Sequence, residues 1–262
     1  MTETTRPRHP LEAENAAFLE KAERSLRDLL NRAKTRNELQ FAFSLTPEFR
    51  GMQDPGWSTA ADAQVAFEDY MTFLKDGEFT RLKARVALGF YCHLSESAGF
   101  YEIPKNMLRV AEGELYQLWP FQELVEVHRQ SGVLIAPNAN RVLRDLTRHA
   151  MDLGLHDLAE VFRDAFDPDL RNGYSHADYV VWNDGIRLRK RDGGQPRIVV
   201  WPEFRCLLDR GVNFFHTLRQ IVAEYISSYH PAKSIRGRLG DAPEQIWTIH
   251  ADPESGTFEI CG

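Results

Sequence analysis

The chain has 262 residues, of which 43% are hydrophobic and 27% charged, as in a soluble globular protein that can bury a proper core. Its formal net charge of −6 at pH 7 argues, taken alone, against a nucleic-acid partner. No apolar run reaches the ~20 residues of a membrane span, and the polar, proline-broken residues 2–15 exclude a signal peptide. We therefore expect a cytoplasmic protein with no membrane partner.

The cysteines and the cofactor motifs exclude several kinds of site. Cys92, Cys206 and Cys261 are odd in number and form no C-x-x-C pair, which argues against a disulfide framework and a structural zinc site. No H-E-x-x-H, Walker A or G-x-G-x-x-G motif occurs, so we expect no cofactor. His93 with Glu96 is a weak metal candidate, but polar residues on a core helix explain such a pair more often, and we predict no metal.

The first segment, residues 1–57, is expected to comprise an N-terminal helix and a connecting loop. The helix is predicted over residues 11–36, where apolar residues form one stripe among charges, and it could pack on the remaining helices or on a second subunit. The rest of the segment contains two prolines and two glycines, which predict a loop. Within it, the alternation of Leu39, Phe41 and Phe43 permits a short strand.

The second segment, residues 58–238, is expected to form a helical bundle. Gly99 and Pro104 are expected to bound a loop, and Gly154 to end a helix. Apolar residues at helical spacing predict helices over residues 60–74, 78–97, 104–117, 120–131, 138–153, 156–166 and 202–229.

The hydrophobic period changes from helical to alternating after Tyr179. An antiparallel β meander is predicted over residues 179–201, with a turn at Asn183-Asp184-Gly185. Two alternating runs in the last segment, residues 239–262, predict a C-terminal β hairpin. The expected fold class is therefore mainly α, with a small antiparallel β meander and a C-terminal hairpin.

The most informative stretch is residues 167–179. It begins like a helix, because Asp167 can cap the helix and Pro168 suits its first position. It places Arg171 five positions before His176. Arginine offers a planar fork of donors that matches phosphate oxygens, and histidine exchanges a proton near neutral pH. Such a pair could support cleavage of RNA without a metal.

This spacing alone is weak support for a site. With 25 arginines and 9 histidines in the chain, about one such pair is expected by chance. Arg144 and His149 form a second pair, in a run whose apolar residues indicate an ordinary amphipathic helix. A structural alternative exists for the first pair too: His176 could lie at a helix end, and Arg171 could pair with a nearby aspartate.

The residues around the first pair make it more specific. Arg171-Asn172, followed by His176 and then Ala177-Asp178-Tyr179, resembles the R-x4-6-H motif of the HEPN superfamily, in which a polar residue usually follows the arginine. The run from Arg85 to Ser97 is similar to an earlier core helix of such proteins, and compatible helical surroundings cover residues 79–230. The resemblance implies an all-α bundle, often a homodimer in which two motif helices face each other across a cleft.

The same resemblance implies a function. Active HEPN proteins are metal-independent endoribonucleases, many of them toxins or antiviral-defence effectors with an antitoxin or other defence partner; other members only bind RNA or partners. Arg171 and His176 would be the catalytic pair and Asn172 the accompanying polar residue. In HEPN toxins paired with a nucleotidyltransferase antitoxin, a modifiable tyrosine stands two places after the histidine. Here Asp178 holds that place and Tyr179 follows it, so the resemblance does not extend to that regulation.

Helix geometry limits how the motif residues can meet. On an ideal helix Arg171 and His176 are about 140° apart around the axis, although a long arginine could bend round. Asn172 lies one turn from His176, so its amide could hydrogen-bond the ring and fix its tautomer. Gly173 weakens the helix and could let a backbone or a phosphate come close.

Positive charge is concentrated after the motif. Residues 186–238 contain eleven basic and four acidic residues, a net charge of +7. This region could hold an RNA backbone, since phosphate contacts supply most non-specific affinity; the alternative is a solvated surface without a partner. The RNA-binding candidates are Arg187, Arg189, Lys190, Arg191 and Arg197.

Two functions are therefore expected from the sequence. The first is a metal-independent endoribonuclease that cleaves RNA by transesterification from the 2′-hydroxyl. The alternative is a non-catalytic HEPN-like module that dimerises and binds RNA or protein.

Overall fold

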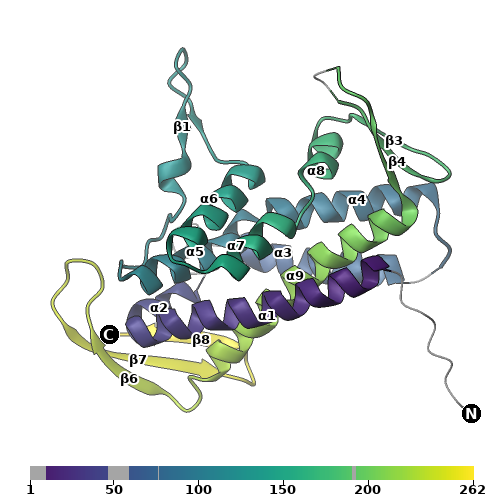
Figure 1. Ribbon diagram of the computed structural model, residues 1–262. Coiled ribbons are helices and arrows are strands. Elements are labelled where there is room, and N and C mark those ends of the chain that lie inside the picture. The colour runs from purple at the N-terminus through teal and green to yellow at the C-terminus, as the bar shows by residue number, and fades with distance from the viewer. Residues whose placement is uncertain (1–9, 47–58, 76, 191–192) are drawn as a thin grey trace, which may run out of the picture.

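The computed structural model describes residues 10–46, 59–75, 77–190 and 193–262. The chain is mainly helical with small antiparallel sheets, as the sequence predicted (Figure 1). No helix in these ranges has the length and apolarity needed to cross a membrane. The helices are α1 (Pro10–Arg36), α2 (Glu38–Ser44), α3 (Thr59–Lys75), α4 (Arg81–Glu96), α5 (Ala98–Glu112), α6 (Ala139–Asp152), α7 (His156–Asp164), α8 (Pro168–Ser175) and α9 (Trp201–Ser227).

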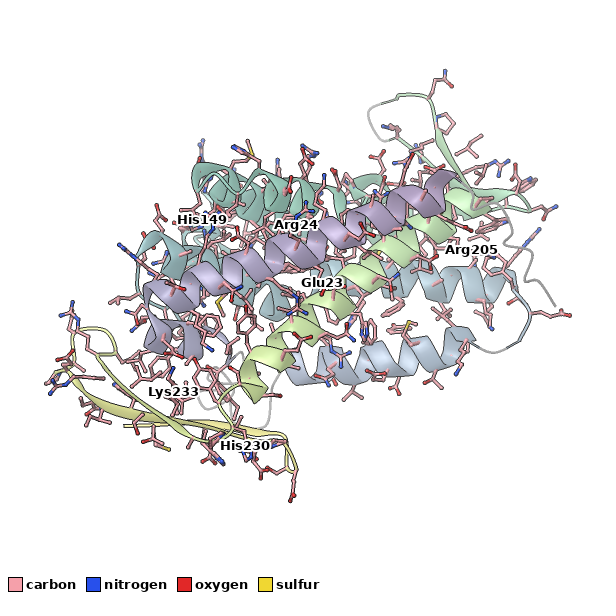
Figure 2. All side chains as sticks on the ribbon, turned by 60° about the horizontal axis from the view of Figure 1, so that its bottom comes forward. Glu23, Arg24, His149, Arg205, His230 and Lys233 are labelled. Carbon is pink, nitrogen blue, oxygen red and sulfur yellow. The ribbon has the colours of Figure 1, made fainter. Side chains whose placement is uncertain are left out.

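Helices α1 and α9 run side by side and in the same direction through the molecule (Figure 2). Near their N-terminal ends, the side-chain amide of Asn15 donates to the carbonyl of Cys206 over 2.7 Å. Towards their C-terminal ends, Arg27 Nη1 lies 2.6 Å from a carboxylate oxygen of Glu224. The first and last long helices of the chain thus form one scaffold on which the others pack.

The hydrophobic core extends from this scaffold through the whole fold. One cluster of buried apolar residues includes Leu26 of α1, Phe90 of α4, Phe215 of α9 and Ile249 near the C-terminus. Aromatic contacts hold its centre, such as the stacked pair Phe100 and Phe215, whose ring centroids lie 4.0 Å apart. This cluster draws on each of the three segments expected from the sequence.

Two β elements project from the same side of the helical body, one on each side of α8 (Figure 1). The first is a hairpin of β1 (Glu126–Val127) and β2 (Leu134–Ile135). The second is the meander predicted after the motif, in which the antiparallel strands follow the order β3-β4-β5. Its strands are β3 (Tyr179–Val181), β4 (Gly185–Leu188) and β5 (Arg197–Val200).

A third sheet lies at the opposite end of the body (Figure 1). The C-terminal hairpin, predicted from the sequence, consists of β7 (Gln245–Asp252) and β8 (Thr257–Cys261), and β6 (Lys233–Gly237) pairs with the other edge of β7. Trp247 of β7 meets Phe43 of α2 edge to face, with ring centroids 5.3 Å apart. The sheet thereby covers the ends of the long helices.

Residues 38–44 form helix α2, so a short strand at Leu39, Phe41 and Phe43 is wrong. Asn37 caps this helix, because its Oδ1 accepts from the N–H of Gln40 at 3.2 Å. All residues from Leu39 to Ser44 are buried, and a helix buried on every side shows no polar face in its sequence.

Two further predictions are also wrong. The region expected as a helix over 120–131 contains a 3-10 turn (Gln122–Leu124) and β1, the first strand of the β1–β2 hairpin. Helix α5 begins at Ala98, so the loop expected between Gly99 and Pro104 is helical. Tyr101 and Met107 of α5 are fully buried, and we attribute the tolerance of a proline inside the helix to this packing.

Candidate functional site around Arg171 and His176

Helix α8 begins as predicted, with Asp167 as its cap and Pro168 in its first turn. Asp167 Oδ1 accepts from the N–H of Leu170 at 3.0 Å, and its Oδ2 accepts from Arg197 of β5 at 2.7 Å. The backbone N–H of Asp167 donates to the hydroxyl of Tyr91 on α4. The start of the motif helix is therefore tied to both α4 and the meander.

Helix α8 ends at Ser175, and His176 occupies the C-cap. The N–H of Asp178 donates to the carbonyl of Gly173 at 2.8 Å, and Ala177 has a φ of 54°, in the left-handed region. This is a Schellman ending, which usually places glycine where Ala177 stands. His176 is thus exposed just beyond the helix, and its place is set by the cap rather than by ideal helix geometry.

The guanidinium of Arg171 is buried and held by two oxygens. Arg171 is only 7% exposed; its Nη1 makes an ion pair with Glu96 Oε1, and its Nη2 donates to Asn172 Oδ1 over 2.7 Å. The other oxygen of Glu96 accepts from the N–H of Ala139 at 3.2 Å. Arg171 and Asn172 are therefore brought together, and Glu96 links them to the end of α4 and the start of α6.

Glu96 is the functional candidate that sequence reasoning missed as a partner of Arg171. It lies 75 residues before Arg171, so no local spacing connects them. One sequence feature points to such a partner: Glu96 is the last residue of α4, where the helix dipole disfavours a carboxylate unless a cation lies nearby. Within the described ranges, no group of three or more His, Cys, Asp or Glu side chains could hold a metal ion, including around His93.

The charge of Arg171 also acts on a thiol. Burial raises the pKa of Cys92 on α4 to about 12, and the positive charge of Arg171 opposes this rise. The thiol is therefore protonated at neutral pH, and Cys92 is part of the buried core.

Gly173 faces the meander rather than an open surface. A Cβ atom at this position would lie 2.7 Å from Cδ2 of Leu188 in β4. Gly89 of α4 likewise leaves room for a neighbouring side chain, because a Cβ there would lie 3.0 Å from the hydroxyl of Tyr174 on α8. These two glycines let α8 approach both β4 and α4 closely, and the space beside Gly173 is occupied by Leu188.

Most of the predicted RNA-binding side chains are ion-paired within the chain. Arg187 Nη1 lies 2.7 Å from Asp184, and Lys190 Nζ lies 3.6 Å from Asp169. Arg197 contacts three carboxylates, those of Asp167 at 2.7 Å, Asp169 at 3.3 Å and Glu203 at 3.0 Å. Arg189 is exposed on the surface, and Arg191 lies outside the described residues.

Residues 186–238, which carry a net charge of +7 in the sequence, therefore form a less positive surface in the folded chain. Three of the carboxylates that pair with it, those of Asp167, Asp169 and Asp184, come before residue 186 and fall outside that count. The chain folds back at the motif and brings them beside the basic strands. RNA binding by this region stays a prediction.

The second Arg-His pair has a different environment. His149 Nε2 lies 2.9 Å from a carboxylate oxygen of Glu112, and its Nδ1 lies 3.4 Å from Nζ of Lys105 (His149 is labelled in Figure 2). Arg144 Nε donates to the carbonyl of Asn140 in its own helix. The pair thus lies on the amphipathic helix α6, as the sequence predicted.

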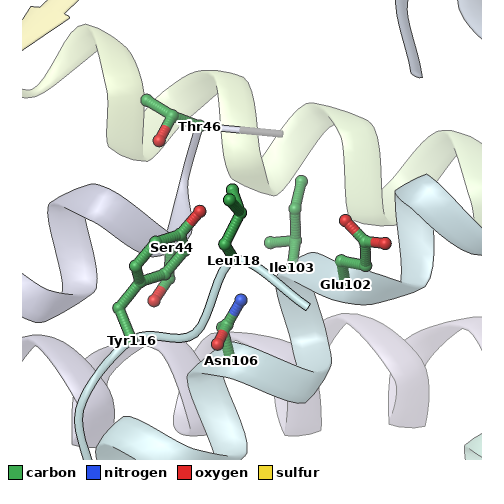
Figure 3. Close-up of a pocket in the computed structure, with 7 residues that line it drawn as sticks. All are labelled: Ser44, Thr46, Glu102, Ile103, Asn106, Tyr116 and Leu118. Atoms are coloured by element: carbon green, nitrogen blue, oxygen red, sulfur yellow. The ribbon is translucent and has the colours of Figure 1, made fainter. Parts of the chain in front are cut away.

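Two hollows in the described part of the molecule differ greatly in size. The smaller, of about 10 Å³, has room for roughly one water molecule. Figure 3 shows its lining side chains, among them Ser44, Asn106 and Tyr116. The larger, of about 710 Å³, lies between α3, α4 and α9. Neither hollow is lined by Arg171 or His176.

No family model, curated protein or solved structure matches this chain.

Proposed function

We propose that this chain is a metal-independent endoribonuclease of the HEPN type that works as a homodimer. The observation that carries the proposal is the arrangement at α8: His176 is exposed directly after the helix that holds Asn172 and the guanidinium of Arg171, fixed by Glu96. A cation that stabilises charge on the phosphoryl oxygens and an exposed imidazole that exchanges a proton are the two groups that phosphodiester cleavage without a metal uses.

The proposed reaction is an internal transfer. The 2′-hydroxyl oxygen of the RNA forms a bond to the neighbouring phosphorus, and the bond from phosphorus to the 5′-oxygen breaks. The products are a 2′,3′-cyclic phosphate and a 5′-hydroxyl. His176 takes the proton of the attacking hydroxyl or gives one to the leaving oxygen, and Arg171 stabilises the charge on the phosphoryl oxygens.

Phosphate reaches Arg171 by competing with Glu96. The Glu96 side chain is 42% exposed, so its ion pair with Arg171 borders solvent even though the arginine itself is buried. Nε of Arg171 is buried and has no hydrogen-bond partner within the described part of the chain, so the guanidinium has to turn towards solvent before this donor can meet a phosphate oxygen.

The dimer is supported by apolar residues on the two β elements that flank α8 (Figure 1). Both elements expose large hydrophobic side chains that a second copy would cover, and a two-fold arrangement would bring two α8 helices together. The exposed residues are Val127, Val133, Leu134 and Ile135 on the hairpin, and Val180, Trp182, Ile198 and Val200 on the meander.

The direct test is cleavage of RNA by the purified protein in EDTA. We expect products with 2′,3′-cyclic phosphate ends, no cleavage of DNA, and a loss of roughly 10² to 10⁴-fold in rate for His176→Ala. His156→Ala is the matched control, because His156 is also exposed and lies on α7. Equal cleavage by His176→Ala and the unmodified protein would refute the proposal.

A second candidate is a non-catalytic HEPN-like module that dimerises and binds RNA or protein. The burial of Arg171 in its ion pair favours this function, because a buried, paired arginine can act as a structural tie. It predicts RNA or partner binding without cyclic-phosphate products. It also predicts that Arg171→Ala weakens assembly as much as it weakens binding.

A further inference from the structure

Helices α4 and α8 pack along a seam that extends beyond the Arg171 motif (Figure 1). Arg171 and Tyr174 are three residues apart on α8, so their side chains lie on the same face. Arg171 contacts Glu96 at the end of α4, and the hydroxyl of Tyr174 lies against Gly89, about two turns earlier on α4. The seam therefore places an aromatic ring next to the guanidinium that the proposed cleavage uses.

Two aromatic rings stack at this seam. Tyr174 of α8 stacks on Tyr179 of β3, with ring centroids 5.8 Å apart and an angle of 28° between the rings. The guanidinium of Arg85 on α4 lies over the ring of Tyr179, 5.9 Å from its centroid. Tyr174 is 39% exposed, and among the described residues no second ring stacks on it. A flat base can therefore extend the stack at Tyr174.

The arginines on this side of α4 contact no carboxylate. Arg81 and Arg85 are both exposed and lie one turn apart. Arg81 Nη2 donates to Oδ1 of Asn183 over 2.7 Å, and in the described part of the chain the guanidinium of Arg85 makes neither a hydrogen bond nor an ion pair. Arg85 thus differs from the ion-paired basic residues of the meander, because its planar fork of donors is open to a phosphate.

We propose that the seam between α4 and α8 binds single-stranded RNA, with an unpaired base stacked on Tyr174 and an adjoining phosphate held by Arg85. This inference rests on the proposed function and adds the class of substrate, an unpaired strand. Every base has a flat face that can stack on an aromatic ring. In an RNA duplex the bases are already stacked and paired, so they cannot extend the stack at Tyr174.

The RNA seam and the proposed dimer contact use different faces of β3. Tyr179 and Val180 are successive residues of this strand, so their side chains point to opposite faces. Tyr179 faces the seam, where it meets Tyr174 and Arg85. Val180 is 53% exposed and belongs to the apolar surface assigned to the second copy. A dimer and a bound strand can therefore exist together.

The probe is a 2′-fluoro oligonucleotide of about five nucleotides, with one 2-aminopurine among uridines and a dye at one end. It lacks the attacking 2′-hydroxyl and is not cleaved, and the fluorescence of 2-aminopurine falls when this base stacks on a ring. We expect saturable binding of the probe to the full-length protein, with quenching. A duplex of the same length should bind roughly tenfold more weakly. Equal binding of strand and duplex, or binding without quenching, would overturn the proposal.

Variants of Tyr174 test the stacking directly. Tyr174→Leu keeps an apolar side chain without a ring and should bind roughly tenfold more weakly, with no quenching at saturation, whereas Tyr174→Phe should keep both. Phe73→Leu is the matched control, because Phe73 is 48% exposed on α3. Thermal unfolding establishes that each variant is folded. Weaker binding of Tyr174→Leu with unchanged quenching would assign the ring a structural role and reject the stacking.

The salt dependence of binding tests the phosphate contact. Arg85→Gln should reduce the slope of log K against log salt by about 0.7, the change for one phosphate contact on a single strand. Arg236→Gln is the control with the same change in net charge, on β6 at the opposite end of the body (Figure 1). Equal slopes for the two variants would overturn the role of Arg85.

Binding and cleavage can fail separately. A protein that binds the probe through Tyr174 but forms no cyclic-phosphate products keeps this site and loses the nuclease. A protein that cleaves RNA but binds the probe equally well as Tyr174→Leu keeps the nuclease and loses this site. If the probe does not bind at all, the site is rejected whatever the result for cleavage.

Discussion

The ion pair between Arg171 and Glu96 sets the behaviour of the motif at the scale of single residues. Arg171 is 7% exposed, and removing a partner from a buried charge leaves that charge without compensation. Solvent around Glu96 weakens the attraction between the two groups. We therefore expect an interaction stronger than a surface ion pair but weaker than a fully buried one.

A double-mutant cycle of Arg171→Met and Glu96→Gln measures this interaction. We expect a coupling free energy of about 1 kcal/mol or more in urea unfolding. Arg24 and Asp157 provide the control cycle, because both are largely exposed and should couple by less. A coupling between Arg171 and Glu96 no larger than in this control would contradict the buried ion pair.

The thiols give a second prediction at this scale. Because burial raises the pKa of Cys92 to about 12, this thiol stays protonated at pH 8 and should not react with a disulfide reagent in the folded protein. Cys261 is exposed and should react quickly. Thiol titration of the protein and of Cys261→Ser checks this. Modification of native Cys92 as fast as that of Cys261 would show that the core around Cys92 opens to solvent.

At the scale of elements, the end of α8 is held in a conformation that its sequence disfavours. Ala177 adopts a φ of 54°, a left-handed conformation that costs an L-residue roughly 1–2 kcal/mol. The cap hydrogen bonds and the ladder between β3 and β4 that follows keep it there. His176 therefore stands between a helix and a strand that are both fixed.

Replacing Ala177 by glycine should relieve that conformation. We expect Ala177→Gly to stabilise the protein by roughly 0.5–1 kcal/mol, after the larger conformational entropy of glycine in the unfolded chain is deducted. Urea unfolding measures the change. Ala177→Val should act in the opposite direction, and stabilisation by valine would show that backbone strain is absent at this position.

The elements differ in how far their sequences predict them. Helix α6 was predicted closely because only one of its faces is buried, with Val142, Leu146 and Ala150 on it. Helix α2 was missed because it is buried all round, and the hairpin at β1 and β2 because tertiary position decides so short an element. The contact between Glu96 and Arg171 joins distant segments, which local patterns do not report.

At the scale of the whole molecule, the two projecting β elements are exposed on one side of the body while the opposite sheet packs on the helices (Figure 1). A count of charges along the chain predicted a positive surface after the motif, but folding placed Asp167, Asp169 and Asp184 against it. The apolar residues of the β elements are therefore more open to a partner than Arg187, Lys190 and Arg197, which are ion-paired within the chain.

The proposed dimer follows from that surface. We expect sedimentation of the protein as a dimer, and a shift towards monomer for the double variant Leu134→Glu with Trp182→Glu, because two charges would have to be buried in the contact. Ile246→Glu is the control, since Ile246 is equally exposed but lies on β7. Monomer behaviour of the unmodified protein at all concentrations would contradict the dimer.

The close fit between Gly173 and Leu188 has a consequence for how this chain can change. Glycine at position 173 of α8 has no Cβ atom, and this leaves room for the large side chain of Leu188 on β4. The two positions together fill one fixed volume. Alanine at 173 would improve the helix but push the strand away, and a smaller residue at 188 would restore the fit. Selection should therefore act on the summed volume of the side chains at positions 173 and 188. A substitution at one of these positions is then tolerated only together with a compensating substitution at the other.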